Sequence, residues 1–118
     1  MKLNKCYFIG RLTRDPETFA NNSVCSFTVA TSRKFKTNQG EERQEVAYIP
    51  VKAFGRQAET AAKYKKGSEV VVDGRFVSES WQDQSGQQKS KLVVYVEMTD
   101  QMGAPAPAQG GYGSAPNY

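Results

Sequence analysis

One segment of this 118-residue sequence has helical spacing, and its place among strand-like segments constrains the fold most. In Arg56–Lys65, three alanines fall on one side of a helix, and alanine has the highest helix propensity. Gly67 follows as a helix stop, and Lys63, Lys65 and Lys66 suit the negative end of a helix dipole. We therefore predict a single helix over Arg56–Lys65.

Five other segments have the composition of strands. They are rich in β-branched and aromatic residues and are bounded by turn residues. We expect three strands before the helix and two after it, at Lys5–Leu12, Val24–Arg33, Glu45–Phe54, Glu69–Ser80 and Ser90–Thr99.

Two polar turns predict long hairpins. The segment Phe35–Arg43 contains Asn38-Gln39-Gly40, which is typical of a hairpin turn, and Gln82–Gln87 joins the last two strands. Pro50 lies inside the third strand and indicates an edge position or a bulge, because proline cannot donate to a sheet ladder.

Five strands with a helix between the third and the fourth is the element order of the OB-fold. We predict an all-β domain over residues 1–102, a five-stranded OB-fold barrel with one short helix and long protruding hairpins. Small SH3-like barrels also have five strands, but the position of the helix favours the OB-fold. Residues 103–118 are rich in Gly, Pro and Ala and carry no charge, so we expect them to form a disordered tail.

The sequence contains no histidine, the usual general acid or base at neutral pH and the commonest transition-metal ligand. Cys6 and Cys25 cannot complete a zinc site of four cysteines, and we expect both to be small buried hydrophobes in a reducing compartment. No apolar run approaches the roughly 18 residues that span a membrane. These features predict a cytoplasmic protein that uses no metal or cofactor, and they propose no enzyme.

Aromatic and basic residues alternate on one face of the third strand. Ile49, Val51 and Ala53 form an apolar core face, whereas the opposite face carries Tyr48, Pro50, Lys52, Phe54 and Arg56. Exposed rings usually mark a binding surface. Rings that alternate with cations suit single-stranded nucleic acid, whose bases stack while its phosphates need neutralising.

The same mixture recurs in both hairpins, around Phe35 and around Trp81. We predict base stacking on four rings, Phe35, Tyr48, Phe54 and Trp81. We predict phosphate contacts from nine cations, Arg33, Lys34, Lys36, Lys52, Arg56, Lys66, Arg75, Lys89 and Lys91. The alternatives are that Tyr48 and Phe54 lie in the barrel core, that Trp81 packs on a neighbouring subunit, and that the cations are ordinary solvated charges.

Other aromatic residues have structural assignments. Phe8, Phe27 and Phe76 alternate with small or polar residues, which predicts core positions. We expect Phe19, in a loop, and Tyr64, on the helix, to cover the barrel ends. Four glycines are expected at bulges, tight bends and the helix stop, at Gly10, Gly55, Gly67 and Gly74.

Four segments resemble the bacterial single-stranded DNA-binding protein (SSB) family. They are Asn4–Pro16 (NKCYFIGRLTRDP), Phe27–Ser32 (FTVATS), Ala53–Arg75 (AFGRQAETAAKYKKGSEVVVDGR) and Ser80–Leu92 (SWQDQSGQQKSKL), and the resemblance keeps its order over about residues 2–102. It implies a nucleoid-associated OB-fold protein that binds and protects single-stranded DNA without sequence preference during replication, recombination and repair. It also implies a homotetramer whose first strands pair across subunits, and stacking residues at the same four rings.

The chain departs from this family in three places. Phe35 and Tyr48 stand where relatives often carry tryptophan, which predicts weaker stacking. Ile49-Pro50 replaces polar or basic residues near the family's subunit contacts. The family's acidic tip, which recruits replication and repair proteins, is absent, and the sequence ends Ala-Pro-Asn-Tyr. The rival functions are an RNA-binding or replication-restart OB module, a protein scaffold that uses the same face, and, least favoured, an enzyme.

Overall fold

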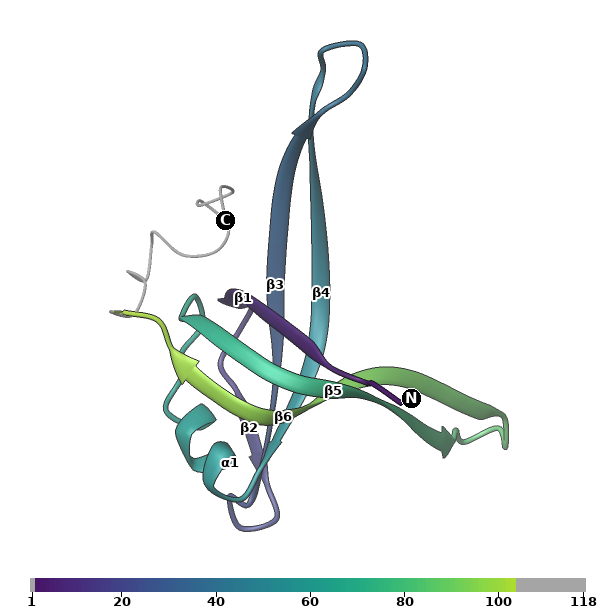
Figure 1. The fold of residues 1–118 in the computed structure, drawn as a ribbon. Coiled ribbons are helices and arrows are strands. Elements are labelled where there is room, and N and C mark those ends of the chain that lie inside the picture. The colour runs from purple at the N-terminus through teal and green to yellow at the C-terminus, as the bar shows by residue number, and fades with distance from the viewer. Residues whose placement is uncertain (1, 104–118) are drawn as a thin grey trace.

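The β-strands of the structure, a computed structural model that describes residues 2–103, close into a barrel with two projecting arms (Figure 1). The elements in chain order are β1 (Cys6–Leu12), β2 (Glu17–Phe19), β3 (Val24–Lys36), β4 (Glu42–Phe54), α1 (Arg56–Ala61), β5 (Glu69–Gln82) and β6 (Gln88–Gln101). The tail expected beyond Gly103 lies outside the described residues.

The barrel closes because β1 has a strand on each side. The sheet order is β1-β5-β6-β4-β3-β2, and β1 also pairs with β3 through Arg11↔Ala30 and Leu12↔Val29. The pairing of β4 with β6 is parallel and begins at Val51, so Pro50 lies where β4 pairs only with β3, as expected of an edge position. The five-stranded OB-fold barrel with one short helix is therefore confirmed.

The short strand β2 was not predicted, and Phe19 lies in it rather than in a loop. Its three residues are all exposed, with Phe19 at 50%, so the strand has no apolar alternation to reveal it. Backbone pairing with Val24 and its neighbours in β3 holds it in place.

The barrel core is built from side chains of every long strand. Leu12, Val29, Val51 and Val70 are fully buried, and Phe27 packs edge-on against Tyr64 with the ring centroids 5.7 Å apart. The half-buried Phe8 packs against this cluster. Cys25 lies inside it as expected, whereas Cys6 is only half-buried.

Phe76 is not a core residue, contrary to the prediction, because 42% of it is exposed. The pairing of β1 with β5 ends at Cys6↔Gly74, so β5 runs past the edge of the barrel at Phe76. There the side chain of Asn4 replaces β1 as the hydrogen-bond partner of the β5 backbone. It accepts a hydrogen bond from the Phe76 N–H and donates one to the Phe76 carbonyl oxygen.

Gly10 and Gly74 are sites of close backbone approach. A Cβ atom at Gly10 would overlap the carbonyl oxygen of Ala30, and one at Gly74 would overlap that of Tyr95. Gly74 also adjoins the register shift between β5 and β6. Both glycines therefore serve the backbone, as their sequence positions suggested.

The helix ends at Ala61, earlier than the predicted Lys65. Ala58 and Ala61 face the core, and beyond them the N–H groups of Lys63 and Tyr64 donate to carbonyl oxygens three residues earlier, so the α-helical hydrogen bonding does not continue. Tyr64 thus lies beyond the helix, though it is buried, and the three lysines expected at the dipole lie past the last turn. Gly67, with φ 85°, turns the chain into β5.

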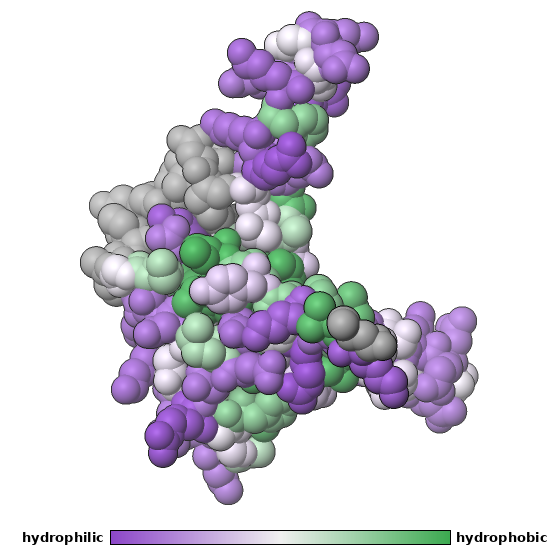
Figure 2. Space-filling model, in the orientation of Figure 1, coloured by the Kyte–Doolittle hydropathy of each residue, from purple (hydrophilic) through white to green (hydrophobic). Residues whose placement is uncertain are grey.

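The two arms are continuations of barrel strands. Strands β3 and β4 pair without a register shift to form one arm, and β5 and β6 extend into the other (Figure 1). Hydrophilic residues cover most of both arms, and hydrophobic residues gather on the body between them (Figure 2). No helix among residues 2–103 is long and apolar enough to cross a membrane.

Candidate nucleic-acid interface

The outward face of β4 carries the rings that strand alternation predicted. Tyr48 is 60% exposed and Phe54 is 41% exposed, while Val51 and Ala53 are fully buried. Because both rings face outward, the alternative that they belong to the barrel core is wrong.

Strands β5 and β6 extend this face beyond β4. Lys52 pairs with Tyr95 across the β4–β6 boundary, and Arg75 pairs with Tyr95 across the next one. Farther out on the arm, Trp81 pairs with Lys89, and Trp81 is 44% exposed. Partners directly opposite one another in a sheet share a face. Outward side chains of β4, β6 and β5 therefore form one continuous surface, which we call the ring–cation face: Tyr48, Lys52, Phe54, Arg75, Glu79, Trp81, Lys89, Lys91 and Tyr95.

Tyr95 belongs to this face but was missed by sequence reasoning. Its ring meets Phe54 with centroids 4.9 Å apart at an interplanar angle of 62°. The guanidinium of Arg75 lies 5.7 Å from the Tyr95 ring centroid. The alternation applied to β4 would have found it, because Lys89, Lys91 and Tyr95 occupy positions of the same parity in β6 and so share one face.

A hydrogen-bonded network lies at the middle of the ring–cation face. The Lys52 Nζ donates to both carboxylate oxygens of Glu79 at 3.0 and 2.9 Å, and the Tyr95 hydroxyl donates to Glu79 Oε2 at 2.7 Å. The hydrogen bonds from these two side chains, with Lys52 contributing most, hold the pKa of Glu79 below its usual value. The hydrogen bond to the Glu79 carboxylate in turn raises the pKa of Tyr95. Lys52 therefore already has an anionic partner within the face.

The β3–β4 arm supplies cations on both of its sides. Lys34 and Lys36 are exposed on the side of Tyr48, because they pair with Gln44 and Glu42. Phe35 pairs with Arg43, which puts it on the opposite side of the ribbon from Tyr48. The structure therefore does not bring Phe35 together with the other three predicted rings.

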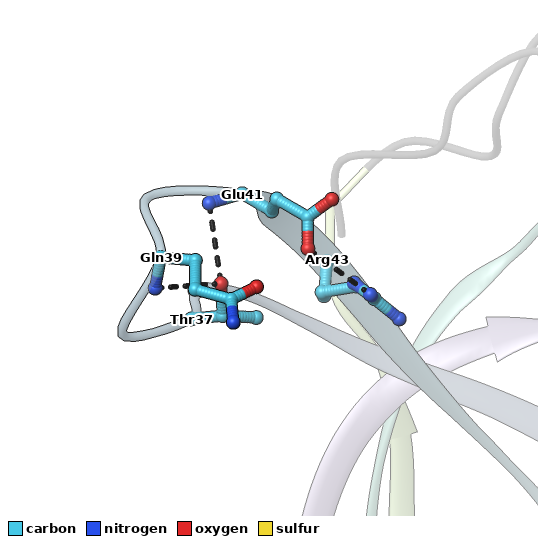
Figure 3. A network of polar contacts seen from close by, with 4 residues as sticks. All are labelled: Thr37, Gln39, Glu41 and Arg43. Atoms are coloured by element: carbon cyan, nitrogen blue, oxygen red, sulfur yellow. Dashed lines mark hydrogen bonds and ion pairs between the residues drawn. The ribbon is translucent and has the colours of Figure 1, made fainter.

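A cation also lies close to the Phe35 ring. The Arg33 guanidinium lies 5.5 Å from the Phe35 ring centroid, and Arg33 also forms an exposed ion pair with Glu45 at 3.6 Å. Farther out, the tip is ordered by Thr37, whose hydroxyl accepts hydrogen bonds from the N–H groups of Gln39 and Glu41, and by the ion pair Arg43–Glu41 at 3.2 Å (Figure 3).

The remaining predicted cations lie off the ring–cation face. Arg56 is exposed at the first residue of α1. Lys66 is exposed in the loop that follows the helix, where its backbone N–H donates to Asp15 at 2.8 Å. Residues 2–103 contain no group of three or more His, Cys, Asp or Glu side chains that could hold a metal ion. The geometry is that of a binding surface.

Comparisons with known proteins agree with this geometry. The sequence model of the "Single-strand binding protein family" matches residues 3–102. The single-stranded DNA-binding protein of Wolinella succinogenes is 42% identical over 113 residues, which cover 92% of this chain and 70% of that protein. That of Helicobacter pylori is 41% identical over 95 residues, which cover 77% of this chain and 53% of that protein. The chain thus spans between half and about two thirds of these relatives' lengths.

Solved structures show the same fold. One is the Plasmodium falciparum SSB in complex with single-stranded DNA, with a TM-score of 0.78 and 21% identity over 87% of this chain and 97% of that chain. Another is a deletion mutant of the Thermus aquaticus single-stranded DNA binding protein, with a TM-score of 0.72 and 27% identity over 92% of this chain and 53% of that chain.

Proposed function

The chain belongs to the single-strand binding protein family, and on this premise we propose that it binds and protects single-stranded DNA without sequence preference. The observation that carries the proposal is the ring–cation face, where Tyr48, Phe54 and Trp81 are exposed beside cations. Base–aromatic stacking contributes about 1–3 kcal/mol per base and tolerates any sequence, because every base has a π-face.

We propose that cations around these rings neutralise phosphates. Arg75, Lys89 and Lys91 flank Trp81 and Tyr95, while Lys34 and Lys36 line the β3–β4 arm on the side of Tyr48. We propose Arg33 with Phe35 as a further contact on the other side of that arm, and Arg56 and Lys66 as peripheral phosphate contacts. Duplex DNA binds poorly in this account, because its bases are already stacked on one another.

We infer a role in replication, recombination and repair, in the cytoplasm and in association with the nucleoid. Stacking that tolerates any base suits coating of any exposed strand, and the proposed function needs no catalytic group. Replication and repair proteins are proposed as partners on the strength of the family resemblance alone.

We also propose that the chain forms a homotetramer through β1. Tyr7 is 68% exposed and Ile9 is 45% exposed on the outward side of this strand, and Met98, which pairs with Asp73 beside Tyr7, is 38% exposed. Exposed apolar side chains gathered on one sheet face usually mark an association surface. Strand β1 is thus the part of the barrel best suited to contact a second copy.

A competition experiment tests the proposed function. A fluorescently labelled oligo-dT bound to the protein is displaced with unlabelled oligo-dT, with duplex DNA of the same length, or with oligo-U. We expect unlabelled oligo-dT to displace it far better than duplex DNA. Equal competition by the duplex would contradict the proposal, and stronger competition by oligo-U would favour an RNA-binding function instead.

A further inference from the structure

The ion pair between Lys52 and Glu79 differs from the ion pair between Arg33 and Glu45 on the β3–β4 arm. Its side chains are only 30% and 19% exposed, whereas those of Arg33 and Glu45 are 72% and 62% exposed. Lys52 also reaches both oxygens of the carboxylate at 2.9–3.0 Å, whereas Arg33 and Glu45 approach only to 3.6 Å. Exposed pairs contribute little and exchange readily with solvent, while a shielded, doubly bonded pair is held more firmly.

This difference affects what Lys52 can do for DNA. If Lys52 turned toward a phosphate, it would leave the half-shielded Glu79 carboxylate without its cation and facing a polyanion. The two costs act together, because an unpaired charge is poorly solvated there and like charges repel. Both costs are smaller when Arg33 turns toward a phosphate, because the exposed Glu45 carboxylate remains solvated after the pair opens.

Glu79 also fixes the position of the Tyr95 side chain. The Tyr95 hydroxyl donates to Glu79 Oε2 at 2.7 Å, and the ring of Tyr95 meets Phe54 at 4.9 Å. A phenol bonded to a carboxylate that is itself bonded to lysine has little rotational freedom. The carboxylate therefore fixes two neighbours, one cationic and one aromatic, at the centre of the ring–cation face.

We propose that Glu79 is a positioning residue of this face, which keeps Lys52 off the phosphates and holds the Tyr95 ring beside Phe54 as an additional stacking ring. The inference rests on the proposed function. It predicts that bases meet the middle of the face, around Phe54 and Tyr95, and that phosphates follow its flanks. Lys52 thereby leaves the set of phosphate contacts that the sequence suggested.

The salt dependence of binding tests the effect on Lys52. Affinity for an oligo-dT of about eight nucleotides is measured between 50 and 200 mM salt for the wild type, Glu79→Gln and Glu45→Gln. Both variants lose one negative charge, but only Glu79→Gln releases a cation that is otherwise held off the phosphates, because the exposed Arg33–Glu45 pair already opens readily. We expect the log–log slope to become more negative by about 0.7 in Glu79→Gln, the increment of one phosphate neutralised on single strands, and to stay at the wild-type value in Glu45→Gln.

A double variant and two tyrosine variants complete the test. Lys52→Met with Glu79→Gln should restore the wild-type slope, since no cation is then released. Tyr95→Ala should weaken binding at least about fivefold, the lower end of a stacked ring's contribution, while Tyr95→Phe, which keeps the ring, should lose less. Far-UV circular dichroism confirms that each variant is folded.

Two results would overturn the inference: equal slopes in Glu79→Gln and Glu45→Gln, or unchanged affinity in Tyr95→Ala. Either can occur while the wild type binds oligo-dT with clear salt dependence, and then only the role of Glu79 and Tyr95 fails. Absence of wild-type binding would instead remove the proposed function, and the inference with it.

Discussion

Trp81 is the single residue that best tests the proposed interface. It is the only tryptophan in the chain, it is 44% exposed, and it pairs with Lys89 on the β5–β6 arm. An indole in this setting offers the largest stacking area of any side chain on the face, with a cation beside it.

Replacing Trp81 with alanine should weaken oligo-dT binding by about 1–3 kcal/mol, because one stacked base loses its platform. The salt slope should not change, since no phosphate contact is removed. Fluorescence anisotropy of a labelled oligonucleotide measures both quantities without relying on tryptophan emission. Lys89→Gln is the matched control, which should make the slope less negative by about 0.7. Wild-type affinity in Trp81→Ala would remove this residue from the site.

We expect Tyr64 to make stability depend on pH in the alkaline range. Burial raises the pKa of its phenol to about 12, although its hydrogen bond with the Thr99 hydroxyl acts in the opposite direction. A raised folded-state pKa means that the contribution is fully present below the unfolded value near 10 and is lost as pH rises toward 12.

We therefore expect the wild type to lose about 2–3 kcal/mol of unfolding free energy between about pH 10 and 12 relative to Tyr64→Phe. The variant lacks the titrating group, so the difference between the two proteins isolates it from other alkaline titrations. Urea unfolding followed by circular dichroism gives the two curves. Parallel curves through this pH range would show that Tyr64 does not titrate as described.

Individual residues were predictable where strand alternation acts alone. The outward rings Tyr48 and Phe54 follow from it directly. Tyr95 was missed although the same alternation extends to β6. The Lys52–Glu79 pair could not be found from the sequence, because its two residues lie 27 positions apart on strands whose pairing the sequence does not show. Phe76 was misassigned because periodicity does not reveal where β1 stops covering β5.

At the scale of elements, the barrel depends on places where two backbones come unusually close. Gly74 is one of them, since a Cβ atom there would meet the Tyr95 carbonyl oxygen, which is backbone and cannot easily move aside. The strand β6 that carries this carbonyl also carries the Tyr95 ring.

Gly74→Ala should therefore lower the unfolding free energy by about 1–3 kcal/mol, the usual cost of overpacking a close contact. Ser80→Ala, an exposed substitution on the same strand, should stay within about 0.5 kcal/mol of the wild type. Chemical denaturation of the two variants under identical conditions makes the comparison. A Gly74→Ala protein as stable as Ser80→Ala would show that the backbones can separate without cost.

Elements were predicted well where several signals agreed. Each long strand was located, though β3, β4, β5 and β6 all extend farther into the arms than expected. Backbone pairing stabilises the polar ends of these strands, and their composition alone does not predict a strand. The helix was overestimated at its C-terminus because local propensity does not show where the hydrogen bonds change to carbonyls three residues earlier, at Lys63 and Tyr64.

At the scale of the whole molecule, the exposed apolar side of β1 bears on self-association. Strand β1 carries Tyr7 and Ile9 on its exposed side, and hydrophobic residues gather on the body between the arms (Figure 2). The barrel order itself was predictable from the position of one helix among five strands, whereas a surface between copies leaves no periodic signal in one sequence.

Sedimentation equilibrium should give a wild-type mass of four times the 13.1 kDa chain. Ile9→Lys should shift the protein toward smaller species, because a buried charge at an apolar interface is unfavourable. Lys2→Glu, at an exposed position before β1, serves as a charge-changing control. A monomeric wild type would contradict the proposed tetramer while leaving the DNA-binding proposal intact.

The most direct test of the central claim follows intrinsic tryptophan fluorescence while oligo-dT is added at two salt concentrations. Trp81 is the only tryptophan, so its emission reports on the ring–cation face. We predict saturable quenching, with an affinity that falls as salt rises by a log–log slope of about −0.7 for each phosphate neutralised. An emission that oligo-dT leaves unchanged at both salt concentrations would contradict the account.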